Sequence, residues 1–219
     1  MDYFNLHTHQ NTTQPDVLEL TNQYPQEFDD SVPFYSIGIH PWHIIESRLD
    51  DDLKIIEEKL NSKSCIAIGE CGLDKKTNIP FELQISAFVK QLALAEKYKK
   101  PVVLHCVASF QEIIAIKNKM KISVPMIIHG FSKNSQLANQ LVKEGFYISF
   151  GKYLLINPEL EKVFREIPND RFFLETDTME EGIKEVYKIA SQYRKITNKE
   201  LQSIIADNFQ FVFNKSLRK

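Results

Sequence analysis

Cysteine, glycine and tryptophan are scarce in this chain of 219 residues, which has only three cysteines, seven glycines and one tryptophan. Cys65, Cys71 and Cys106 form no Cys-x-x-Cys pair. An odd number of dispersed cysteines argues against a disulfide framework and indicates reduced thiols. The chain also lacks both an apolar run of about 18 residues, which a membrane span would need, and the opening segments of a signal peptide. We therefore expect a cytoplasmic protein with no membrane partner.

The chain also lacks an excess of either positive or negative charge. The 27 basic and 29 acidic residues give a net charge of −2, and 43% of the residues are hydrophobic. This composition is ordinary for a soluble globular protein, and it excludes collagen-like, low-complexity and mainly disordered chains. A near-zero charge argues against a protein that coats polyanions generally, but it leaves room for a locally positive site.

Short apolar runs alternate with helical patterns along the whole chain. The runs predict strands at Tyr3–His9, Val17–Leu20, Phe34–His40, Cys65–Gly69, Val102–Cys106, Met126–Gly130, Phe146–Phe150 and Phe172–Thr176. The helical patterns cover Asp51–Asn61, Phe81–Lys99, Ser109–Lys119, Ser135–Glu144, Pro158–Glu166, Glu180–Tyr193 and Asn198–Phe213, the last after a Thr197-x-x-Glu200 capping box. Such alternation predicts an α/β fold with a parallel sheet.

About eight strands suggest a (β/α)8 TIM-type barrel, which usually takes about 250 residues. We therefore predict a trimmed or distorted barrel, with the trimming in Gln10–Pro33, where helical periodicity is weak. No linker rich in glycine, serine or proline divides the chain, so residues 1–219 are expected to form a single domain.

Residue types that bind metals stand at the ends of the strong strands. They are His7, His9, Glu70, His105, His129 and Asp177. In a (β/α)8 barrel the carboxyl ends of all strands meet at one face, where active sites are built. Residues two apart on a strand point to the same side, so His7 and His9 can reach one ion.

Each of these residues has an ordinary structural explanation when it is taken alone. A histidine at a strand end is more often packed or capping than ligating, and a glutamate after a glycine is usually a loop residue. Several ionisable groups at one face would be costly to bury without a compensating charge, which a metal supplies. Four imidazoles and two carboxylates suit Zn, Mn, Ni, Co or Fe and serve Mg less well.

The motifs in this order resemble those of the TatD family of metal-dependent deoxyribonucleases. The matching segments are His7–His9, Gly38–Pro41, Ile68–Asp74, Pro101–His105, Ile128–Ser132 and Leu174–Asp177. The resemblance implies a distorted TIM-type barrel with two divalent metal ions. It also implies that His7, His9 and Asp177 bind one ion, that His105 and His129 bind the other, and that Glu70 bridges the two.

Three positions differ from the family pattern. Asn5 stands where the family usually has aspartate, and Cys106-Val107-Ala108 replaces a short run with an arginine that contacts phosphate. After Asp177 the family usually continues with Ala-Pro-Tyr and a longer substrate loop, whereas here residues 178–182 lead almost at once into a predicted helix. These differences leave the substrate less well defined than the metals.

A pair of divalent ions can activate a water molecule and clamp the oxygens of a phosphodiester. In this interpretation Glu70 and Asp177 are the catalytic carboxylates, and Asp177 orients the water or takes its proton. Glu175 and Asp74 could hold ligating histidines in place or serve as plain loop residues.

Substrate contacts are predicted at His40, which ends a predicted strand, and at Lys75, which follows the loop of residues 70–74. Trp42 and His43 either stack on a base or staple their own loop. The expected partner is DNA, single-stranded or with frayed ends. The oligomeric state stays open, with a monomer as the simplest case.

Two other functions remain open from the sequence. One is a metal-dependent hydrolase of a similar barrel that acts on an amide, an ester, a lactone or a phosphomonoester. The other is a degenerate, noncatalytic barrel that binds metal or a partner protein.

Overall fold

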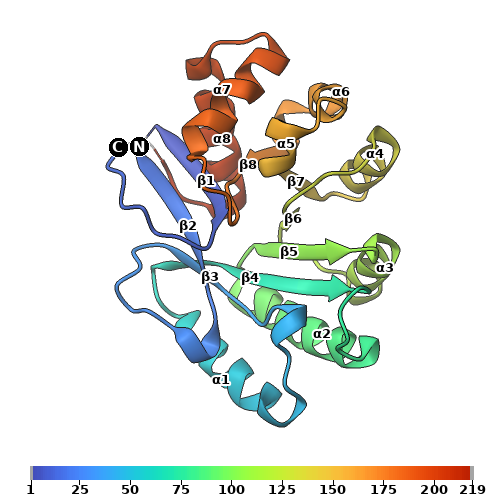
Figure 1. Ribbon diagram of the computed structural model, residues 1–219. Coiled ribbons are helices and arrows are strands. Elements are labelled where there is room, and N and C mark those ends of the chain that lie inside the picture. Colours follow the sequence, from blue (N-terminus) through green and yellow to red (C-terminus); the bar gives the residue numbers. More distant parts are fainter. Residues whose placement is uncertain (1, 218–219) are drawn as a thin grey trace. The chain divides into compact units, whose positions relative to one another are not determined.

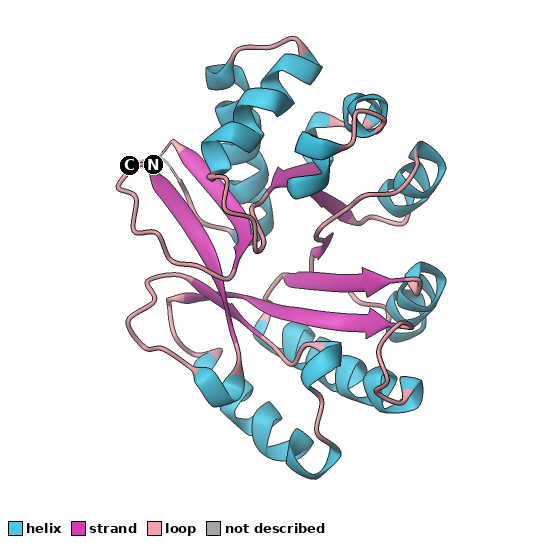
Figure 2. Cartoon of the chain, in the orientation of Figure 1, coloured by secondary structure: helices cyan, strands magenta, loops and turns pink. Residues whose placement is uncertain are grey.

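The computed structural model describes residues 2–217 and contains eight parallel strands that follow one another in chain order. The strands are β1 (Tyr3–Thr8), β2 (Val17–Gln23), β3 (Tyr35–Ile37), β4 (Cys65–Asp74), β5 (Val102–Val107), β6 (Met126–Ile128), β7 (Tyr147–Phe150) and β8 (Phe172–Leu174). This order, with helices between the strands (Figures 1 and 2), is that of a (β/α)8 TIM-type barrel.

The helices lie close to their predicted positions. They are α1 (Leu49–Lys59), α2 (Phe81–Tyr98), α3 (Phe110–Met120), α4 (Ser135–Lys143), α5 (Lys152–Ile156), α6 (Leu160–Glu166), α7 (Ile183–Arg194) and α8 (Asn198–Phe213). Four short 3-10 helices accompany them, namely η1 (Pro25–Glu27), η2 (Pro41–His43), η3 (Glu46–Arg48) and η4 (Asn169–Arg171). The capping box of Thr197 and Glu200 opens α8 as predicted. The short helix α5 was missed by the sequence pattern.

The barrel is trimmed in the predicted region, residues 10–33, where the helices that usually connect the strands are absent or short. β2 follows β1 through residues 9–16, which are all described and contain no helix. Only the short helix η1 separates β2 from β3. The predicted distortion is visible as register shifts where β3 pairs with β4 and where β4 pairs with β5.

The chain divides into two compact units, residues 1–20 with 127–219 and residues 21–126. The core of the first unit is largely aromatic. Phe4 packs edge-on against Phe173, Phe209 and Phe213, with ring centroids 4.6 to 5.8 Å apart. α7 and α8 carry the apolar faces that cover β1 and β8 in this unit (Figure 1).

In the second unit α2 lies along β4, which pairs with β5 (Figure 2). The predicted stripe of α2 is buried at Phe88, Leu92 and Ala95. The side chains of two glutamines on the same helix form hydrogen bonds with backbone groups of other segments. The side chain of Gln84 accepts from Asp74 N at 2.8 Å, and that of Gln91 accepts from Ile39 N at 2.7 Å. Helix α2 therefore fixes the two loops that carry polar site residues in this unit.

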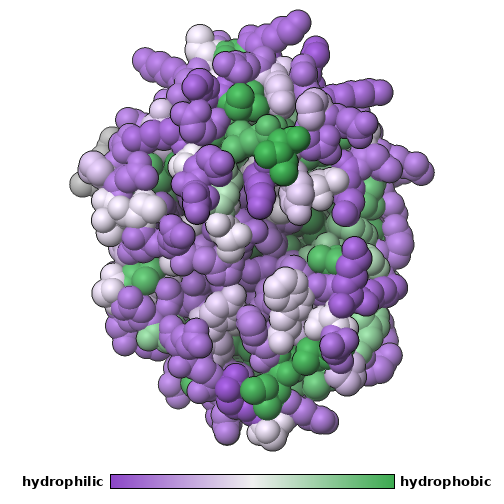
Figure 3. Space-filling view, in the orientation of Figure 1, coloured by the Kyte–Doolittle hydropathy of each residue, from purple (hydrophilic) through white to green (hydrophobic). Residues whose placement is uncertain are grey.

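Charged residues lie mainly on the surface, and Figure 3 shows a face that is mostly hydrophilic with small hydrophobic patches. The structure contains no helix, among the residues it describes, that is both long and apolar enough to cross a membrane.

Candidate metal centre

The first cluster of polar side chains belongs to the unit formed by residues 1–20 and 127–219. His7 and His9 lie at the end of β1, and Asp177 follows β8. The backbone ties these segments together, since Asp177 N donates to His7 O at 2.9 Å and His9 N donates to Asp177 O at 3.2 Å. Asp177 adopts a φ of 54° and forms an isolated parallel bridge with Thr8 of β1.

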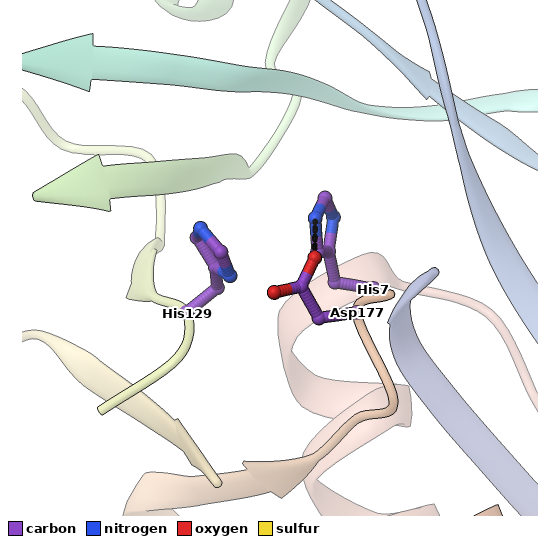
Figure 4. A group of neighbouring side chains, drawn as sticks. All are labelled: His7, His129 and Asp177. Carbon is purple, nitrogen blue, oxygen red and sulfur yellow. Dashed lines mark ion pairs between the residues drawn. The ribbon is translucent and has the colours of Figure 1, made fainter. Parts of the chain in front are cut away.

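The side chains of His7, His129 and Asp177 lie close together and face a common space (Figure 4). Oδ1 of Asp177 lies 3.4 Å from Nε2 of His9 and 3.7 Å from Nε2 of His7. His129, directly after β6, places its ring centroid 4.5 Å from that of His7. One ligand atom each of His7, His129 and Asp177 lies within 4.8 Å of the other two. His7 is fully buried while the Asp177 side chain is 37% exposed, so the cluster is reached from solvent on the Asp177 side.

Glu175 lies behind His129. Its Oε1 accepts from Gly130 N at 2.6 Å and lies 3.5 Å from Nδ1 of His129. A side chain on Gly151 would overlap with Glu175, so glycine is needed there to admit this carboxylate. Of the two roles open for Glu175, the structure favours the partner of a histidine. Such partners fix the ring orientation of a ligating histidine and raise its basicity.

The second cluster lies within residues 21–126 and centres on Glu70. Oε1 of Glu70 is 2.8 Å from Nδ1 of His105 and 3.2 Å from Nε2 of His40. The rings of His40 and His105 lie 4.3 Å apart, and one ligand atom of each of the three residues lies within 4.8 Å of the other two. Glu70 and His40 are buried, and His105 is nearly so.

Burial lowers the pKa of His40, although the neighbouring Glu70 carboxylate opposes this effect. Nδ1 of His40 accepts from Trp42 N at 3.1 Å, so the other ring nitrogen faces Glu70. A lowered pKa favours the neutral imidazole, which is the form that ligates metals. The structure groups His40 with the potential ligands Glu70 and His105. The phosphate contact that the sequence suggested for His40 stays a prediction.

Asp74 connects His105 to Trp42 of η2. Its Oδ2 accepts from Trp42 Nε1 at 2.6 Å and lies 3.2 Å from Nε2 of His105, while Oδ1 accepts from Lys76 N at 2.7 Å. Burial acts to raise the pKa of Asp74, but these hydrogen bonds and His105 outweigh it and lower the pKa. Both roles considered for Asp74 are therefore met, since it orients a histidine and caps its own loop.

The position of Glu70 differs from the prediction. The sequence pattern ended the fourth strand at Gly69, with Glu70 closing it, but β4 runs on to Asp74. The register with β5 shifts between Ile68 and Cys71, so Glu70 lies at a bulge inside the strand. A bulge re-aims a side chain without ending the pairing. Asn22 on β2 supports the bulge by accepting from Glu70 N at 2.6 Å.

Both clusters fit a divalent metal ion by their donor chemistry. Each offers at least two imidazoles and one carboxylate, and groups of this kind bind Zn and the neighbouring transition metals. The same side chains are buried or half-buried, where uncompensated charge is costly. His7, His9, His129 and Asp177 could hold metal in one unit, and His40, Glu70 and His105 could do so in the other.

The model of the TatD related DNase family matches residues 3–214. The chain belongs to this family. It is therefore a metal-dependent hydrolase, as the order of its motifs predicted, and its metal-binding residue types are grouped in two clusters of the structure.

Three similar proteins illustrate the membership. The metal-dependent hydrolase YabD of Bacillus subtilis is 28% identical over 82% of this chain and 77% of its own length. The 3′-5′ ssDNA/RNA exonuclease TatD of Erwinia tasmaniensis is 32% identical over 73% of this chain and 61% of its own. The crystal structure of YjjV, a TatD homologue from Escherichia coli, has a TM-score of 0.84 and 21% identity, and the match covers 98% of both chains. This likeness confirms the predicted (β/α)8 barrel fold.

Asn5, which stands at the place of the usual TatD aspartate, is part of the first cluster's support. It is 1% exposed, and its side chain both donates to Thr176 Oγ1 at 2.8 Å and accepts from Thr176 N at 3.0 Å. Thr176 directly precedes Asp177. An amide suits this pairing because it offers a donor and an acceptor side by side. Asn5 therefore holds the segment that carries Asp177.

Replacing Asn5 by alanine should lower the free energy of unfolding by roughly 1–3 kcal/mol, because the backbone N–H of Thr176 loses its buried acceptor. Thr176→Val should lower it too, since it leaves the Asn5 amide without its acceptor. If the two residues act as one clamp, urea unfolding of the single and double variants will show non-additive losses. Fully additive losses would contradict the clamp.

Lys75, the second predicted substrate contact, is engaged on the surface. Its ammonium group pairs with Glu112 of α3 and lies over the ring of Phe81. Substrate binding by Lys75 stays a prediction. Asn5, Asn22 and Gln84 were missed as supporting residues, because nothing in their sequence neighbourhood marks an amide that binds a distant backbone group.

Proposed function

We propose that this TatD family protein is a nuclease that hydrolyses phosphodiester bonds of single-stranded DNA from an end, with two divalent metal ions. The observation that carries the proposal is the pair of histidine and carboxylate clusters, one in each compact unit. Mn, Zn, Mg, Ni and Co are the candidate ions, with nitrogen-rich donor sets favouring the transition metals. How the ligands divide between the ions, with Glu70 as the bridge, stays a prediction from the family resemblance.

A divalent ion bound at such a site lowers the pKa of water and neutralises charge on a phosphoryl oxygen. The protein's own residues provide the rest. Asp177 is the most exposed carboxylate of the first cluster, so it can orient the attacking water and accept its proton. Glu175 and Asp74 keep the rings of His129 and His105 in place, which preserves the spacing of the donor atoms.

The choice of DNA rests on the family description and on relatives. The Erwinia tasmaniensis protein is named as an exonuclease of single-stranded DNA and RNA. RNA is therefore the second nucleic acid to be tested here. A single domain over residues 1–219 is part of the same proposal, since the family model matches residues 3–214 in one stretch. Three free cysteines support a reducing compartment such as the cytoplasm.

The test is a substrate panel with metal-stripped protein. After EDTA treatment and readdition of Mn²⁺ or Mg²⁺, the protein should shorten end-labelled single-stranded DNA progressively, and EDTA alone should abolish cleavage. His7→Ala should remove the activity, because His7 is the fully buried imidazole of the first cluster. Circular dichroism melting of the variant checks that it folds, and His9→Ala provides a second variant at a partly exposed ligand.

The matched control is Glu161→Gln, which changes an exposed carboxylate on α6, a helix that carries no residue of either cluster. It should leave cleavage unchanged. Metal-dependent hydrolysis of p-nitrophenyl phosphate, an ester or a lactone without cleavage of DNA or RNA would overturn the nuclease assignment. Cleavage that survives in both folded histidine variants would overturn the site.

A further inference from the structure

A pocket of about 380 Å³ lies within residues 21–126, beside the cluster of His40, Glu70 and His105. It is lined by η1 with Tyr24, by residues 38–39 and 42–45, and by the polar side chains Arg48 and Asp52 near the start of α1. Its size is in the range of small-molecule sites. Neither the metal ligands nor the proposed hydrolysis accounts for it.

Trp42 stands between the pocket and the cluster. Its indole nitrogen donates to Asp74, and its ring lies 4.9 Å from that of His40 and 5.7 Å from that of His105. The side chain is nevertheless 56% exposed, which is unusual for so large an apolar group held by a buried partner. Trp42 is therefore fixed at its polar edge, and its ring faces solvent next to the cluster.

The rest of the pocket combines further rings with a polar end. Tyr24 and His43 pack edge-on at 5.4 Å, and isoleucines add apolar lining to the pocket. At the polar end the buried Asp52 accepts from Gln26 Nε2 at 2.5 Å and from Arg48 Nε at 3.1 Å. A guanidinium carries five N–H donors, so Arg48 can also donate to a ligand.

We infer that this pocket binds one nucleobase of the substrate, the base attached to the phosphate held at the neighbouring cluster. The inference rests on the proposed nuclease function. A planar heterocycle matches aromatic walls that end in polar groups, because its faces stack and its edge forms hydrogen bonds. A phosphate in the pocket is disfavoured, since Glu27 and Asp52 both line it. A purely aliphatic ligand would leave the polar end unmatched.

The single tryptophan of the chain makes the inference directly measurable. In EDTA, where no cleavage occurs, a thymidine trinucleotide should quench the fluorescence of Trp42 in a saturable titration. A trimer of abasic sugar phosphates, which carries the same charge, should leave the emission unchanged. Equal quenching by both trimers, or no quenching by either, would overturn the pocket assignment.

Tyr24→Ala removes one wall of the pocket and keeps both the reporter and the cluster. Base stacking on an aromatic side chain is worth about 1–3 kcal/mol, so KM or Kd for the thymidine trimer should rise roughly 5- to 150-fold. Tyr24→Phe, which retains the ring, should restore most of the affinity. Phe211→Ala, which removes an exposed ring of α8, should change nothing. An unchanged affinity in Tyr24→Ala would contradict the inference.

The two proposals fail in different ways. Cleavage of DNA and abasic strands at equal KM would leave the nuclease standing and overturn the base pocket. Base-dependent quenching without hydrolysis of any nucleic acid in Mn²⁺ or Mg²⁺ would support the base pocket and overturn the nuclease.

Discussion

Replacing Glu70 with glutamine should lower kcat/KM for DNA by more than about 100-fold, because even side chains that merely support metal ligands contribute 10- to 100-fold. The substitution keeps the shape of the side chain and removes its charge. His40 and His105 both lie against Oε1 of Glu70, so they would face a neutral amide instead of a carboxylate. Initial rates on labelled single-stranded DNA, with metal content measured by mass spectrometry, provide the test.

The control for this variant is Glu57→Gln, which alters a surface carboxylate paired with Lys97 outside the cluster. It should retain full activity and metal content. A Glu70→Gln protein that binds as much metal as the wild type and cleaves DNA within a few fold of its rate would contradict the role of Glu70. Loss of activity with unchanged metal content would show that the carboxylate acts in the reaction beyond holding the ion.

Much of the fold could be predicted because it depends on local periodicity. Buried parallel strands are continuous apolar runs, and the helices between them carry an apolar stripe such as Phe88, Leu92 and Ala95. The limits of α8 were predicted correctly because the Thr197 capping box marks its start. The helix α5 was missed, since five residues cannot establish a helical period.

The candidate ligands of the first cluster could be predicted because strand ends place them at known positions. His7 and His9 are two apart on one strand, and the structure groups both with Asp177. What the sequence could not predict is which distant groups meet. The link from Trp42 through Asp74 to His105 joins three segments by side-chain contacts alone. No pattern within any one segment encodes such contacts, so the structure is needed to find them.

The course of β4 past Glu70 is a clear case in which the predicted end of a strand was wrong. The predicted strand ended at Gly69, but β4 runs through both Gly69 and Gly72 to Asp74, although glycine is unfavourable inside strands. In the structure both have positive φ, 128° and 147°, and both lie against the backbone of β5. The glycines allow the strand to bulge and continue, and they thereby carry Glu70 and Asp74 to their histidine partners.

Replacing Gly72 with alanine should therefore lower the free energy of unfolding by roughly 2–6 kcal/mol. A Cβ at this position would overlap with the carbonyl oxygen of His105, and overpacking of this kind costs about 1–3 kcal/mol. Holding alanine at a φ of 147° adds strain of about 1–3 kcal/mol. Such a loss is a large part of the total stability of a domain, so urea unfolding of the variant should show a much lower midpoint.

Gly182→Ala is the matched control, because a Cβ there meets no atom within 4 Å and φ is already −71°. Because Gly182 is the N-cap of α7 and alanine caps less well than glycine, this variant should lower the free energy of unfolding by about 1 kcal/mol or less. If Gly72→Ala fails to fold, Gly72→Ala in the presence of excess Mn²⁺ tests whether ligand binding recovers the native state. A Gly72→Ala protein as stable as Gly182→Ala would mean that β4 does not need glycine beside His105. In that case the bulge could not be what holds Glu70 against its two histidines.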